Sequence, residues 1–206
     1  MYIKIKKIKI HIICLFLLLL FASINFSVYM IILFSCVFIH EMGHILFIKL
    51  SRLHILSIEI LPFGINILTD KNRLTAYKTD MIIALSGPCV NIICSAFILA
   101  IIKIIGYDSV LFFAFLTNIL YAIINLFPVK NLDGGRVLEN LLKIIIPENL
   151  ALSYAIFSII SAVSLGILSI FALFILMVTG YNFTLILLCC YLFYTIHFAP
   201  KFNVCF

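Results

Sequence analysis

Residues 28–50 read VYMIILFSCVFIHEMGHILFIKL, an apolar stretch that carries the polar cluster His40-Glu41-Met42-Gly43-His44. A helix needs about 20 residues to cross the hydrocarbon core of a bilayer, and this stretch is long enough. Ionisable side chains at membrane depth are costly and are usually functional. The stretch therefore predicts a transmembrane helix with a chemical site built into it.

The order His-Glu-x-x-His is the pattern of zinc hydrolases. Residues four apart on a helix project from the same face, so His40 and His44 can bind one metal ion. Glu41 then lies beside that ion and can act as the general base on a water molecule. The pattern predicts one Zn²⁺ per chain, and the alternative is a membrane helix with incidental histidines.

The composition indicates an integral membrane protein. Of 206 residues, 66% are hydrophobic and 11% are charged. This is more apolar surface than a small soluble core can bury. We expect an all-α polytopic membrane protein with about six spans, at 8–26, 28–50, 80–104, 109–127, 154–178 and 182–199. We expect one transmembrane domain over 1–206, with a core at 28–142 and no appended soluble domain.

The basic residues orient these spans. With the N-terminus in the cytoplasm, only Lys103 of the 14 Lys and Arg residues faces outside, as the positive-inside rule requires. Both termini are then cytoplasmic. The first span resembles a signal peptide, but Leu20 and Phe21 stand where a cleavage site needs small side chains, so we expect it to be retained.

Two further kinds of site are excluded. The net charge of +6 is spread over predicted cytoplasmic loops rather than gathered in a patch, which argues against a nucleic-acid partner. The seven cysteines form no C-x-x-C pair, so neither a disulfide framework nor a cysteine zinc site is indicated.

A catalytic zinc site usually has three protein ligands, so one ligand is missing from the helical motif. Asp133 is the best candidate, because it follows a span that enters from the outside and stands in NLFPVKNLDGG, residues 125–135. Pro128 breaks the helix there, and two glycines permit tight turns. Topology excludes Asp108, and Glu59 lacks a flanking motif. The alternative for Asp133 is an ordinary turn or helix cap.

Other polar positions have structural or functional interpretations. In the sequence SGPCVN, residues 86–91, Gly and Pro allow a kink and a close helix approach, and Asn91 needs a hydrogen-bond partner in the bilayer. Asn125 is similar. Residues 54–68 alternate in part and contain Pro62-Phe63-Gly64, which predicts short extended strands; the alternative is an amphipathic surface loop.

The paired motifs HEMGH and NLFPVKNLDGG resemble those of the site-2 protease family of intramembrane zinc metalloproteases, most closely the stage IV sporulation protein FB type. The likeness covers about 28–142. It implies that His40, His44 and Asp133 hold zinc and that Glu41 polarises the attacking water.

The resemblance also implies a biological setting. It implies cleavage of a membrane-associated protein substrate in regulated intramembrane proteolysis in a bacterial cell membrane, for example of a pro-sigma factor during sporulation, with a regulatory membrane protein as a further partner. By the same resemblance Asn91 and Asn125 position substrate or loops, and the strands around Pro62, Phe63 and Gly64 pair with an unwound substrate in a membrane-associated β segment. The nucleotide-sensing domain common in sporulation-type enzymes has no counterpart in this sequence.

Two other functions stay open at this stage. A zinc transporter can also carry helical histidines, but alternating access calls for polar groups across the whole membrane, and the outer halves of these spans have few. A catalytically inactive membrane scaffold is the other alternative, and the intact Glu41 argues against it.

Overall fold

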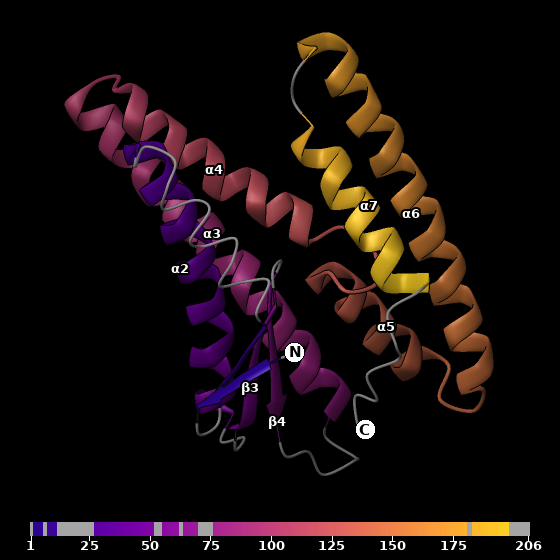
Figure 1. The fold of residues 1–206 in the computed structure, drawn as a ribbon. Coiled ribbons are helices and arrows are strands. Elements are labelled where there is room, and N and C mark those ends of the chain that lie inside the picture. The colour runs from indigo at the N-terminus through magenta and orange to yellow at the C-terminus, as the bar shows by residue number, and fades with distance from the viewer. Residues whose placement is uncertain are drawn as a thin grey trace. The chain divides into compact units, whose positions relative to one another are not determined.

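The computed structural model describes residues 2–5, 8–11, 27–51, 55–61, 64–69, 76–180 and 183–197 (Figure 1). They form two compact units, of which the first comprises 1–73 and 86–122 and the second 74–85 and 123–206. The helices are α2 (Val28–Leu50), α3 (Ala76–Ile105), α4 (Ser109–Asn125), α5 (Asp133–Ile145), α6 (Leu150–Thr179) and α7 (Thr184–His197). The strands are β1 (Tyr2–Ile5), β2 (Ile8–His11), β3 (Ile55–Leu61) and β4 (Gly64–Thr69).

The long apolar helices agree with the predicted membrane protein. Within the described part of the chain, α2, α3 and α6 are long and apolar enough to cross a bilayer, and α4 and α7 are shorter apolar helices. Helix α2 has the predicted bounds, and the other four cover the predicted spans to within a few residues at each end. A total of six spans stays a prediction.

The first predicted span needs a correction. The sequence places its start at residue 8, but residues 8–11 form strand β2. Isoleucine alternates with lysine in Ile3-Lys4-Ile5 and again in Ile8-Lys9-Ile10, which is the period of a strand rather than of a helix. The rest of that predicted span, residues 12–26, lies outside the described residues.

The strands form one four-stranded sheet in the first unit, in the order β1-β2-β3-β4. The β1–β2 and β3–β4 pairs are antiparallel, and β2 pairs with β3 in parallel. Strands β3 and β4 lie where the alternation in 54–68 predicts extended structure, and the Leu61–Gly64 pair closes their hairpin. The N-terminal pair was not predicted, so the all-α class omits half of this sheet. Association of the sheet with the membrane stays a prediction.

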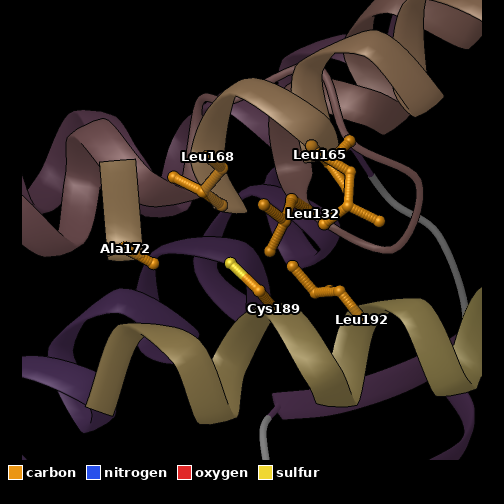
Figure 2. Packing of buried hydrophobic residues seen from close by; sticks show 7 residues of the cluster. Leu132, Leu165, Leu168, Ala172, Cys189 and Leu192 are labelled. Carbon is orange, nitrogen blue, oxygen red and sulfur yellow. The ribbon is translucent and has the colours of Figure 1, made fainter. Parts of the chain in front are cut away.

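In the second unit, the loop before α5 packs into a core made by α6 and α7 (Figure 2). Val129 and Leu132 come from the loop, and the helices add Leu165, Leu168, Ala172, Cys189 and Leu192. Helix α6 begins where the Asn149 side chain accepts a hydrogen bond from the Leu152 amide at 2.9 Å. The buried loop residues hold the segment that leads into Asp133.

Candidate metal centre

The two motif histidines converge on one point in the first unit. His40 and His44 lie one turn apart on α2 and are 2% and 6% exposed. Their Nε2 atoms are 3.2 Å apart. Two nitrogens that each lie about 2.0–2.1 Å from a tetrahedral zinc ion are about 3.3–3.4 Å from each other. The pair therefore has the spacing of two ligands on one ion.

The opposite ring nitrogens contact α3. His40 Nδ1 lies 3.2 Å from Asn91 Oδ1, and His44 Nδ1 lies 3.4 Å from Ser86 Oγ. A histidine that binds metal through one nitrogen usually hydrogen-bonds through the other, which fixes its ring. The hydrogen-bond partner that the sequence analysis expected for Asn91 is thus His40. The contact between Ser86 and His44 was not predicted.

Two glycines allow α2 and α3 to approach closely at this point. A Cβ atom on Gly87 would lie 2.6 Å from His44 Cε1 and 2.8 Å from His40 Cε1. A Cβ atom on Gly43 would lie 2.9 Å from the Ser86 carbonyl oxygen. The close approach expected around Gly87 is therefore found, and it occurs against the histidine rings themselves.

Helix α4 contributes one aromatic side chain, Tyr121, to the surroundings of His40. The ring of Tyr121 meets the His40 ring edge to face, with centroids 4.9 Å apart. Aromatic pairs prefer such edge-to-face arrangements, so the contact favours this orientation of the His40 ring. Sequence reasoning did not single out Tyr121, because a tyrosine in an apolar span has no motif around it.

Glu41 lies next to His40 and is also buried, at 6% exposed. A carboxylate held in a low-dielectric surrounding keeps strong electrostatic interactions, because little water screens it. A buried carboxylate in this place can serve as an acid–base group beside two potential metal ligands.

In the second unit, Asp133 is the first residue of α5 and is 8% exposed. The N-cap residue is Leu132, whose side chain makes no cap hydrogen bond. Asp133 therefore stands one position inside the cap, where its negative charge suits the helix dipole.

The loop before Asp133 packs against the two glycines that follow Asp133 in the sequence. A Cβ atom on Gly134 would collide with the carbonyl of Leu126, and one on Gly135 with the carbonyl of Val129. Backbone atoms cannot move aside as a flexible side chain can. Both positions therefore require glycine for the loop to fold over the start of α5.

Two hydrogen bonds attach this loop to the neighbouring helices of the second unit. The Lys130 amide donates to Ser161 Oγ on α6 at 2.8 Å. The Asn131 side chain donates to Thr195 Oγ1 on α7 at 3.0 Å, and Asn131 has a left-handed backbone with φ of 76°. These bonds fix the course of the chain just before Asp133.

Other candidate residues take different places. Asp108 caps α4 by accepting hydrogen bonds from the amides of Val110 and Leu111, both at 2.9 Å. Glu139 forms an ion pair with Lys143 at 2.8 Å. Asn125 is the last residue of α4 and is partly exposed. Gly64 begins β4, whereas Pro62 and Phe63 lie outside the described residues.

Apolar helices of membrane length, with two buried histidines and a neighbouring glutamate on one of them, are the features of a membrane protein with a candidate metal site. Comparisons with known proteins narrow this description. Residues 102–171 match peptidase family M50, and this range contains Asp133 but not the two histidines.

Two comparisons match the chain to Methanocaldococcus jannaschii, one by sequence and one by structure. A zinc metalloprotease is 32% identical over 126 residues, which are 59% of this chain and 36% of that protein. The chain thus covers little more than a third of that relative. The solved structure of a site-2 protease is 26% identical with a TM-score of 0.60, and the match covers 94% of this chain and 92% of that one. The three matches agree in kind, because they are to a peptidase family, a zinc metalloprotease and a site-2 protease.

Proposed function

We propose that this chain is an intramembrane zinc endopeptidase that hydrolyses a peptide bond of a membrane-associated protein. The observation that carries the proposal is the 3.2 Å separation of His40 Nε2 and His44 Nε2, with Glu41 buried beside them on a helix of membrane length. The similarity to a site-2 protease over 94% of the chain supports the same function.

Asp133 is the proposed third ligand. It is a buried carboxylate at the first position of α5, and the sequence motif NLFPVKNLDGG is what points to it as a ligand. A carboxylate suits this role because two neutral imidazoles bring no negative charge to a dication. The competing acids Asp108 and Glu139 already serve a helix cap and an ion pair.

The chemistry then divides between the ion and the chain. A bound zinc ion lowers the pKa of water towards about 7 and acts as a Lewis acid. Glu41 accepts a proton from the attacking water while the oxygen of that water bonds to the carbonyl carbon of the substrate. Glu41 then delivers that proton to the nitrogen of the leaving amine as the C–N bond breaks. His40 and His44 would each offer the lone pair of Nε2 to the ion.

The test is Glu41→Gln, which keeps size and polarity but removes the proton acceptor. The purified variant should retain zinc and its melting temperature, and it should release no fragment from co-expressed single-span substrates. Substantial cleavage by this variant would remove Glu41 from the mechanism.

The substrate is expected to bind as an extended strand. In the order β1-β2-β3-β4, strand β4 pairs with β3 alone among the described strands, which makes it an edge strand of this sheet. A peptide bond in a helix is shielded, and addition to a sheet edge would hold the unwound segment. This assigns Pro62, Phe63 and Gly64 to substrate positioning, and we propose a similar role for Asn125.

We further propose the setting implied by the sequence motifs. The chain would act in regulated intramembrane proteolysis in a bacterial cell membrane, with both termini cytoplasmic, and the sporulation protein FB type suggests a pro-sigma factor or membrane-bound regulator as substrate. Cysteine labelling tests the orientation, since Lys49→Cys and Asp108→Cys should react from opposite sides. Reaction from the same side would refute it.

A further inference from the structure

A series of buried side-chain hydrogen bonds links Asn118 to Asn91 and Asn91 to His40. Asn118 Nδ2 donates to the carbonyl of Ala114 at 2.9 Å, and Asn91 Nδ2 donates to Asn118 Oδ1 at 3.1 Å. Asn91 Oδ1 then lies 3.2 Å from His40 Nδ1. His40, Asn91 and Asn118 are all almost completely buried. Water therefore cannot readily replace these bonds.

Backbone carbonyls fix which group donates and which accepts in this series of hydrogen bonds. A carbonyl can only accept a hydrogen bond, so Asn118 must turn its amide nitrogen towards Ala114 and leave its oxygen for Asn91. Asn91 Nδ2 also donates to the carbonyl of Cys36 at 3.3 Å, which gives a second anchor. The oxygen of Asn91 is therefore the atom that faces His40, and His40 Nδ1 must be the donor.

The direction selects one tautomer of His40. A neutral imidazole that carries its proton on Nδ1 has its lone pair on Nε2, the nitrogen that faces His44 Nε2. If Asn91 were flipped, its amide would donate to Nδ1 and the proton would move to Nε2, where it would block metal binding. The flip would also aim the Asn91 oxygen at the acceptors of Asn118 and Cys36. The Ser86 hydroxyl beside His44 imposes no such choice, because it can donate or accept.

We propose that Asn91 and Asn118 are positioning residues that fix His40 as the tautomer with an unprotonated Nε2, and that Asn118 acts only through Asn91. The inference rests on the proposed function, because it takes His40 as a zinc ligand. It adds Asn118, which has no motif in the sequence, to the residues that determine zinc affinity.

The experiment measures the zinc affinity of the purified full chain in detergent by competition with a chelator. Asn91→Leu and Asn118→Leu should each weaken binding by about 10-fold or more, the usual effect of losing the hydrogen-bond partner of a metal ligand. Asn118→Asp keeps an acceptor oxygen towards Asn91, so it should restore most of the affinity lost in Asn118→Leu. The absorption spectrum of the Co²⁺-loaded protein should change in the two leucine variants and return in the aspartate variant.

The double variant separates positioning from a general packing role. If Asn118 acts through Asn91, Asn91→Leu/Asn118→Leu should bind zinc no more weakly than Asn91→Leu alone. Ser95→Ala is the matched control, because Ser95 is buried on the same helix α3 and its hydroxyl donates to the Ile92 carbonyl rather than to this hydrogen-bond chain. Its zinc affinity should equal that of the wild type.

Several results would overturn the inference: unchanged zinc affinity in Asn118→Leu, additive losses in the double variant, or an equal loss in Ser95→Ala. Melting temperatures accompany each affinity, and Asn118→Ala replaces the leucine variant if that does not fold. A wild-type chain that binds no zinc would instead refute the proposed function. The two failures are therefore distinguishable.

Discussion

Gly87→Ala tests whether the glycine contact between α2 and α3 sets the position of the histidines. The added methyl carbon would lie 2.6 Å from His44 Cε1 and closer still to His44 Nε2, the proposed ligand atom. Ordinary contact begins at 3.4 Å, so the His44 ring must shift by at least about 0.8 Å, the difference between the two distances for Cε1. Zinc–ligand distances tolerate about 0.2 Å. The required shift is several times larger than the site can absorb.

The same substitution should change stability far less than activity. Replacing glycine by alanine inside a helix contributes about 1 kcal/mol of stability, whereas overpacking a buried contact costs about 1–3 kcal/mol. The two effects largely offset each other. We expect a change of at most about 2 kcal/mol in stability. Proteolytic activity should fall by about 100-fold or more, as expected when reacting groups are misplaced by about 1 Å.

The assay pairs zinc content and substrate cleavage with thermal unfolding in detergent. Gly166→Ala in α6 is the matched control, because a Cβ atom there meets nothing within 4 Å. That variant should be as stable as the wild type or slightly more stable, with normal zinc content. Normal zinc content and cleavage in Gly87→Ala would refute the proposed role of this contact.

Two further predictions concern the second unit. Asp133→Asn should lower zinc affinity markedly because it removes the proposed charged ligand, whereas Asp80→Asn should leave zinc affinity nearly unchanged. Zinc titration of both variants measures this difference. Normal affinity in Asp133→Asn would exclude Asp133 as the ligand. Glu139→Gln should lower the melting temperature more than Lys143→Met does, because the first change leaves a buried ammonium without its carboxylate partner and the second leaves a carboxylate that reaches water. The reverse order of melting temperatures would refute this account of the pair.

Hydrophobic runs predicted the long helices well but placed the start of the first span on residues that form strand β2. Five helices lie where the runs place them, since a bilayer demands a minimum apolar length. The isoleucine–lysine alternation before residue 11 resembles the charged start of a span, although it has the period of a strand. Strand β2 pairs with β3, which lies far away in the sequence, and no local pattern predicts that contact.

The site shows the same limit at the level of single residues. His40, Glu41 and His44 could be found because their spacing matches helical periodicity. Asn118 could have been noticed as a polar side chain in an apolar span, but its link to His40 runs through Asn91 on another helix. Such a contact depends on how helices pack, which a single sequence does not state.

The hydrogen bonds of the loop before Asp133 also order events during biosynthesis. Residues 130 and 131 emerge from the ribosome before Ser161 and Thr195, to which they are bonded. The loop can therefore reach its final course only after α6 and most of α7 have been translated. A nascent chain would already contain the histidine motif at that time, but the placement of Asp133 would await synthesis of the last described helix. The proposed metal site would thus be completed late in translation, long after the histidine motif has left the ribosome.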